Sequence, residues 1–473
     1  MADTIPMDVV PEKVYSQEYS SQIDYEEKVY NHPSPLMVKI TPVGGGTSPN
    51  LSLTAAGTLS EFQIPSKVVN LSRSYISADL AFPASGDADT FVNLSGNLGD
   101  IIDRIVVSTI GSNTILADIS NVGNFLEAVD APSTKLVDFL DKAGGFSTTL
   151  PTTADDAKSC PVSDITRVNA ATNPAGAVFT SGAVGDDNGA IYTGVKSVYS
   201  TAVANGASYL SVKLPLSMFK STILAVDKEF YFSGEALNIA IYWSAVNTYA
   251  WGAKNGTSIA ATPISLPSAP TMSGLALYAS VEQNTILTSR LVNKVNTEGL
   301  TLPIPVVWSS KQAITSANPS INLNITRSHG NSLLWVAWAP FNGTESGSTC
   351  KSHTTYPVSQ YNTYLNSIPV LTNSGISVEA GEQYLYNKEN IVESAIQSQV
   401  AYNNRFTHFD NFSGFSLPDL QDNLTLTNGI DLTREAQQWQ LQATLGTSTA
   451  LNHYIFWATQ KQLLLTRSGV VLV

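Results

Sequence analysis

The five histidines and the many serines are the residues in this sequence that could do chemistry, and neither set has the spacing of a reactive site. Zinc sites are built from His and Cys pairs a few residues apart, and the sequence has no H-x-x-x-H or C-x-x-C arrangement. It also lacks the G-x-S-x-G turn of a nucleophilic serine and the G-x-x-x-x-G-K-[ST] phosphate loop. We therefore expect no catalytic residue, no cofactor-binding residue and no metal ligand. The histidines are His32, His329, His353, His408 and His453.

Two acidic clusters offer oxygen ligands of the kind that calcium prefers. Asp186-Asp187 is followed by Asn188-Gly189, without the spaced ligands and distal Glu of an EF-hand, so we interpret it as a turn. Asp155-Asp156 is interpreted as a solvated loop. His329 stands beside Gly330 and is expected to be a turn residue.

Tryptophans supply the remaining candidate site, because exposed aromatic rings could line a sugar-binding groove. Packing in the core or between subunits is the favoured role, since large aromatic side chains bury well. These residues fall in or beside predicted strands: Trp243, Trp251, Trp335, Trp338, Trp439 and Trp457.

The composition favours an all-β protein that does not bind nucleic acid directly. Hydrophobic residues make up 43% of the 473 residues and charged residues only 13%. Ser, Thr and Asn, which are poor helix formers, take the place of the missing charges. The formal net charge is −13, whereas binding to phosphate or to anionic lipid needs an excess of Lys and Arg.

Features that would direct the chain to the secretory pathway or a membrane are not expected. Cys160 and Cys350 are far apart, which predicts two free thiols and a reducing compartment rather than a disulfide framework. The first residues contain no signal peptide, and no apolar stretch is long enough to be a transmembrane segment.

The first 30 residues differ from the rest of the chain. Seven acidic residues stand against Lys13 and Lys28, with four tyrosines among them. This composition predicts either an extended arm that becomes ordered when it docks on another surface, or a flexible tail. The acidic residues and tyrosines are Asp3, Asp8, Glu12, Glu18, Asp24, Glu26 and Glu27, and Tyr15, Tyr19, Tyr25 and Tyr30.

The rest of the chain has period-two alternation of apolar residues, typical of strands with one buried face. In the first half the predicted strands are 36–41, 59–64, 73–82, 101–110, 114–119, 212–216, 230–232 and 237–243, with helical spacing at 122–129 and 136–140. In the second half they are 275–281, 300–306, 321–325, 334–338, 439–445, 454–457, 463–465 and 470–473, with helices at 286–295 and 390–402.

The same strand pattern therefore occurs twice. The Gly- and Pro-rich stretch around 253–271 lies between the two occurrences and predicts a linker. We expect an N-terminal acidic arm at 1–30, a first jelly roll at 31–252, the linker at 253–271 and a second jelly roll at 272–473. A sheet with one apolar face must bury it against another sheet, so the fold class is all-β, with two tandem eight-stranded jelly-roll β-sandwiches, a few short helices and long loops.

Several segments resemble the double jelly-roll major capsid proteins of Polinton-like viruses and virophages, within the adenovirus and tectivirus lineage. Ile101–Val107 followed by Thr114–Ile119 and a short helix is similar to the first roll, as is Ala225–Phe230 leading into Leu237–Trp243. Met272–Val281, then Asn293-Lys294-Val295 and Gly299-Leu300, are similar to the opening of the second roll. The resemblance is in the order of patterns over most of the chain.

This resemblance implies a structural protein of the virion and not an enzyme. It implies a homotrimer that forms a pseudo-hexameric capsomer, with neighbouring capsomers, penton and minor capsid proteins as partners and an internal membrane as one arrangement beneath the shell. The segments 145–210 and 340–385 would be tower loops, and the N-terminal arm would run along the inner face and tie neighbouring capsomers together. The alternative is a carbohydrate-binding jelly-roll protein, either a lectin or a fibre-head adhesin.

Overall fold

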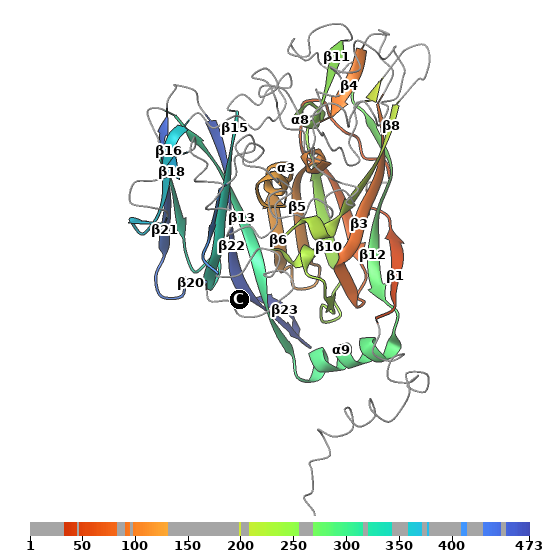
Figure 1. The fold of residues 1–473 in the computed structure, drawn as a ribbon. Helices are drawn as coiled ribbons and strands as arrows, with labels where there is room; N and C mark the ends of the chain where they lie inside the picture. The colour runs from red at the N-terminus through yellow and green to blue at the C-terminus, as the bar shows by residue number, and fades with distance from the viewer. Residues whose placement is uncertain are drawn as a thin grey trace, which may run out of the picture.

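The chain folds into two β-sandwiches that stand beside each other (Figure 1). The fold is taken from a computed structural model. It describes residues 33–44, 47–82, 90–94, 98–130, 198–199, 208–254, 268–315, 320–342, 358–370, 376–377, 408–413, 429–445 and 451–473.

The first sandwich consists of two antiparallel sheets, each with four strands on its main path. One has the order β1 (Pro35–Ile40), β12 (Thr271–Glu282), β3 (Val69–Phe82) and β8 (Ser208–Pro215), with β9 (Glu229–Phe230) paired to β3. The other has the order β2 (Thr58–Ile64), β10 (Leu237–Trp243), β5 (Ile102–Thr109) and β6 (Ile115–Ser120).

The second sandwich repeats this plan. Its inner sheet has the order β13 (Leu300–Ile314), β22 (Leu451–Thr466), β15 (Ser332–Asn342) and β19 (His408–Asn411), with β20 (Ile430–Asp431) on β15 and β23 (Gly469–Leu472) on β22. Its outer sheet has the order β14 (Ser320–Ile325), β21 (Gln437–Leu445), β16 (Val358–Leu365) and β17 (Ile368–Pro369), with β18 (Ile376–Ser377) on β16. Each sandwich thus has the eight main strands expected of a jelly roll.

Short elements complete the described part. A small sheet of β11 (Ala250–Lys254), β4 (Thr90–Leu94) and β7 (Val198–Tyr199) lies above the first sandwich in Figure 1. The helical elements are η1 (Leu98–Ile101), α3 (Val122–Phe125), η2 (Leu126–Asp130), η4 (Leu216–Met218), η5 (Ile223–Ala225), α8 (Val246–Tyr249) and α9 (Thr285–Thr297). In Figure 1 α9 lies at the base and connects the two sandwiches.

Strand β10 shows how alternation in the sequence positions the core. Leu237, Ile239 and Ile241 are buried to 1% exposure or less, and β10 pairs with β2 on one side and β5 on the other. Successive side chains of a strand point to opposite faces, so these three all enter the space between the two sheets. The predicted bounds of this strand and the predicted hairpin of β5 and β6 are both confirmed.

Strand β22 differs because both of its faces are buried. Every residue from Tyr454 to Ala458 is buried. Ile455 and Trp457 belong to the core of the second sandwich, whereas Phe456 packs into the cluster shared with the first sandwich. A sheet covered on both sides requires a continuous apolar run, which is what this segment provides.

The boundary between the two sandwiches that follows from the strand pairing differs from the boundary predicted from the sequence. The predicted boundaries placed 272–473 in the second jelly roll, but β12 pairs with β1 and β3 of the first. Paired strands of a jelly roll are distant in the chain, so a Pro-rich stretch of sequence between two strands of one sandwich resembles a linker between two sandwiches. We propose that the first sandwich extends to Glu282 and that α9 is the connection.

The prediction of a loop throughout 340–385 is wrong for β16, which lies within the outer sheet of the second sandwich. Polar residues at Gln360 and Asn362 dilute its apolar alternation, so the strand was not recognised. The arm at 1–30, the helices at 136–140 and 390–402 and nearly all of 145–210 lie outside the described residues.

Candidate assembly surfaces

The two sandwiches pack against each other through buried side chains. Phe125 of α3 and Phe456 of β22 meet edge to face with ring centroids 5.4 Å apart. The Trp335 indole donates a 3.1 Å hydrogen bond to the Ser221 hydroxyl, and both residues are fully buried. Because apolar packing and a satisfied polar contact cross this boundary, the two sandwiches form one block.

A carboxylate joins the sandwiches near the base. Oε2 of Glu235 accepts hydrogen bonds from the Ser112 backbone N–H (2.7 Å) and hydroxyl (3.0 Å), and Oε1 accepts one from the Val470 N–H (3.3 Å). Thr114 also donates to the Val470 carbonyl at 2.8 Å. Partial burial opposes ionisation of Glu235, but these hydrogen bonds outweigh it and hold its pKa below the usual value. We call Glu235 and its partners the inter-roll clasp.

Gly469 allows the C-terminal strand to approach this clasp. Its φ of +137° lies in the region that favours glycine, and a Cβ there would stand 3.1 Å from Oε1 of Glu235. The clasp therefore needs both the carboxylate and the glycine, which lie 234 residues apart in sequence.

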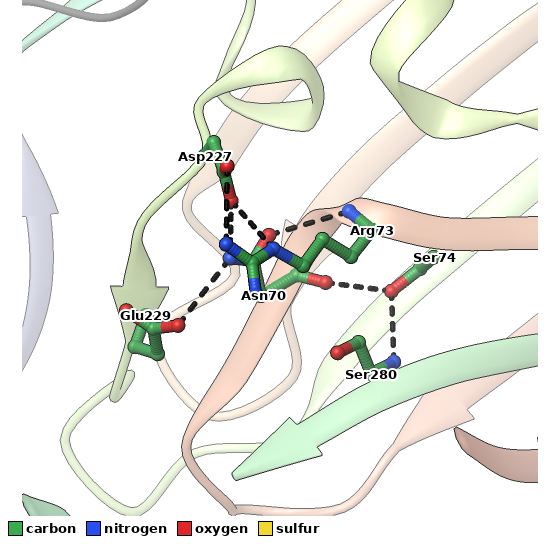
Figure 2. Close-up of polar contacts among 6 residues, drawn as sticks. All are labelled: Asn70, Arg73, Ser74, Asp227, Glu229 and Ser280. Atoms are coloured by element: carbon green, nitrogen blue, oxygen red, sulfur yellow. Dashed lines mark hydrogen bonds and ion pairs between the residues drawn. The ribbon is translucent and has the colours of Figure 1, made fainter. Parts of the chain in front are cut away.

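A second polar cluster fixes the turn before β9 onto β3 (Figure 2). The Arg73 guanidinium donates to both carboxylate oxygens of Asp227, at 2.9 and 3.2 Å, and the Asn70 amide donates to Asp227 at 2.8 Å. The hydrogen bond from Arg73, with help from Asn70, lowers the pKa of Asp227. Since this pair is about half exposed, we interpret the cluster as a structural lock rather than a reactive site.

Ser74 completes the same cluster by bridging an irregularity between β3 and β12. Its hydroxyl donates to the Asn70 carbonyl at 2.7 Å and accepts from the Ser280 N–H at 3.0 Å, where the register of the two strands shifts. The side chain thus replaces the ladder bonds that the bulge removes.

The two end layers of the block carry different surfaces. On the outer side of the first sandwich Tyr75 and Tyr278 stack with ring centroids 4.9 Å apart. The exposed Lys39 pairs with Tyr278, and Met37, two residues earlier on the same strand, is 41% exposed. We call this the tyrosine face. Tyrosine and methionine are enriched in protein interfaces.

On the opposite end the outer sheet of the second sandwich presents mainly amides and small polar groups, together with Tyr364 of β16 and Ile368 of β17. Strands β14, β16 and β21 contain no Asp, Glu, Lys or Arg. We call this the amide face, and its outward side chains are Asn322, Asn324, Gln438, Gln440 and Gln442. Charged residues are depleted in interface cores, so a charge-free face fits a surface that becomes covered.

The residues considered for other chemistry do not converge on a site in the described part of the chain. Trp243, Trp335, Trp338 and Trp439 are buried to 2% exposure or less, which confirms their role in the core and removes them from any sugar groove. In the same residues no His, Cys, Asp and Glu side chains cluster as metal ligands would, and no helix has the length and apolarity needed to cross a bilayer. Asp155-Asp156, Asp186-Asp187 and both cysteines lie outside the described residues.

His329 occupies the expected turn, but its surroundings are more specific than the sequence indicated. Its Nδ1 accepts a hydrogen bond from the Thr326 N–H at 3.1 Å, and its ring lies 4.9 Å from Trp308 and 5.7 Å from Trp457. Burial lowers the pKa of His329, and nearby Lys461 lowers it further. The histidine thus packs against both indoles, and its partial burial favours the neutral form of the ring.

Neither a protein-family model nor a curated protein matches the chain in sequence. Solved structures do match in fold. The Faustovirus major capsid protein gives a TM-score of 0.51 at 11% identity, covering 95% of this chain and 94% of that one. The mavirus major capsid protein gives 0.50 at 9% identity, covering 92% and 90%. The PBCV-1 capsid gives 0.50 at 10% identity, covering 93% and 97%.

These matches extend over nearly the full length of both chains, so they include both sandwiches and their order. The chain therefore has the double jelly-roll fold of viral major capsid proteins. The sequence prediction of an all-β protein with two tandem jelly rolls is confirmed.

Proposed function

We propose that the chain is a viral major capsid protein, a structural component of the virion and not an enzyme. The observation that carries the proposal is the pairing of two jelly rolls in one block with the architecture of major capsid proteins. Fold alone does not define function, so the proposal also draws on the surfaces of the block. One end face carries the stacked pair Tyr75 and Tyr278, and strands β14, β16 and β21 of the other lack charged residues; both features are common in interfaces.

We further propose that three chains form a pseudo-hexameric capsomer and that capsomers tile an icosahedral shell. Each chain contributes two similar sandwiches, so a ring of three presents six. The tyrosine face and the amide face lie at opposite ends of the row of sheets (Figure 1). A contact between unlike faces is head-to-tail, and it closes into a ring when the rotation allows. Penton and minor capsid proteins are the remaining partners, and direct nucleic-acid binding is not proposed for a chain of net charge −13.

Light scattering coupled to size-exclusion chromatography tests the trimer. The chain mass is 50.5 kDa, so the expected mass is about 150 kDa, as three copies require. A measured mass of one chain at every protein concentration tested would refute the proposal that three chains form a capsomer.

A further inference from the structure

Helix α9 at the base is covered on one side only. The Asn284 side chain caps it by accepting from the N–H groups of Ile286 and Leu287, at 3.0 and 3.3 Å. Of its 13 residues only Val295 is buried, and Leu291 packs partly against the core. Ile286, Leu287, Thr288 and Val292 are partly buried as well, and the remaining residues of the helix are exposed.

The uncovered side of α9 carries more positive than negative charge, since Arg290, Lys294 and the nearby Arg467 stand against the single carboxylate of Glu298. Arg290 and Lys294 are both exposed and stand four residues apart, so they share one face of the helix. Arg467, in the turn between β22 and β23, lines a hollow of about 530 Å³ with the end of α9. We call Arg290, Lys294 and Arg467 the basal strip. Within the described residues none of the three forms an ion pair.

The described chain begins next to this strip. The Ser34 N–H donates to the Glu282 carboxylate at 2.8 Å, and the Ser34 carbonyl accepts from the Gln283 N–H at 2.9 Å. Glu282 also accepts from the N–H of Asn284, the cap of α9, at 2.7 Å. The preceding segment, residues 1–32, is thus tethered at the first turn of α9.

Charge and reach connect that segment to the strip. Residues 1–32 contain seven acidic residues and two lysines. Lys294 lies about 15 Å along the helix axis from Asn284, a span that about five extended residues cover. Asp24, Glu26 and Glu27 stand seven to ten residues before Ser34, so the chain between them and Ser34 is long enough for their carboxylates to reach Lys294.

We propose that the acidic N-terminal segment of each chain docks on the basal strip of the same chain, with Asp24–Glu27 against Lys294 and Arg467. The strip supplies three cations and the segment supplies the anions. The tether raises the effective concentration of the chain's own segment to the millimolar range, which favours it over the segment of a neighbouring copy.

Carbodiimide coupling of the full-length protein tests the contact, because this reagent joins a carboxylate to a lysine amine only where they touch. We expect peptides that link Lys294 to Asp24, Glu26 or Glu27, and we expect them to disappear at about 0.5 M salt, where the screening length falls to a few ångströms. In protein assembled from isotopically light and heavy chains, each link should join peptides of one isotope. Mixed links would show that a neighbour's segment occupies the strip and would overturn the proposal.

Neutralising the segment gives a second readout. Asp24→Asn/Glu26→Gln/Glu27→Gln should speed amide hydrogen exchange in α9 about two- to fivefold, the effect of losing exposed ion pairs. The matched control neutralises the distal acids, Asp3→Asn/Asp8→Asn, and should leave α9 unchanged.

Lys294→Arg removes the amine that the carbodiimide reaction needs but keeps the positive charge on which docking depends. It should abolish coupling while keeping α9 protected, whereas Lys311, an exposed lysine on β13, should not couple to the segment in any variant. Equal coupling of the segment to Lys311 and Lys294, or unchanged exchange in α9 after neutralisation, would refute docking. Neither result affects the expected trimer mass, so this proposal and the proposed function fail independently.

Discussion

Neighbouring residues of β22 make the coupling between the sandwiches testable, because Phe456 and Ile455 point in opposite directions. Phe456 is fully buried against the first sandwich and Ile455 against the outer sheet of the second. Phe456→Ala removes a buried ring and leaves a cavity, at a cost of about 3–5 kcal/mol. Ile455→Ala costs about 2–5 kcal/mol, so the two variants differ mainly in which part of the protein loses stability.

Hydrogen exchange with peptide resolution shows the location, with both variants at the same protein concentration because association stabilises the fold. A loss of 3 kcal/mol raises local opening roughly 100-fold. Phe456→Ala should raise exchange in α3 and η5 of the first sandwich as well as in β22, whereas Ile455→Ala should raise it in β21 and β16. If Phe456→Ala changed only the second sandwich, the two rolls would not form one block.

Three further substitutions have defined outcomes. Glu235→Gln should lower the unfolding free energy by about 1–2 kcal/mol at neutral pH. The pKa of Glu235 in the folded protein lies below 4.5, so the wild type should lose its advantage over Glu235→Gln as the pH falls below 4.5. A difference in unfolding free energy, measured in urea, that stays the same at every pH would contradict the clasp. The pKa of His329 in the folded protein lies below 6.5, so the unfolding free energy of the wild type should fall as the pH drops below 6.5. His329→Gln should remove this dependence on pH. Gln442→Glu on the amide face should reduce the trimer at micromolar concentration in light scattering, because an unpaired charge in an interface costs about 2–5 kcal/mol, while the exposed control Ser66→Glu should not.

Local patterns in the sequence predicted the elements well where one face is buried. Alternation identified β10 with its bounds, and helical spacing over 286–295 identified α9. Strand β22 was predicted as two short segments because Gln460 and Lys461 interrupt the apolar run. In the structure the strand continues through them, since the Lys461 ammonium lies 5.5 Å from the Trp308 ring and Gln460 is buried.

Contacts between distant segments could not be predicted from one sequence. Nothing near Asp227 indicates that its partner is Arg73, 154 residues earlier. The return of β12 to the first sandwich depends in the same way on pairing with β1 and β3. Glu235 looks like a turn residue until the C-terminal strand is placed beside it. The fold class therefore followed from local periodicity, whereas the clasp and the end faces required the tertiary structure.

Electron microscopy of the purified protein tests the central claim most directly. Two jelly rolls per chain in a ring of three predict single particles with threefold symmetry, a hexagonal outline and six sandwich-shaped lobes. Particles that contain only two lobes, or assemblies without a threefold axis, would contradict it.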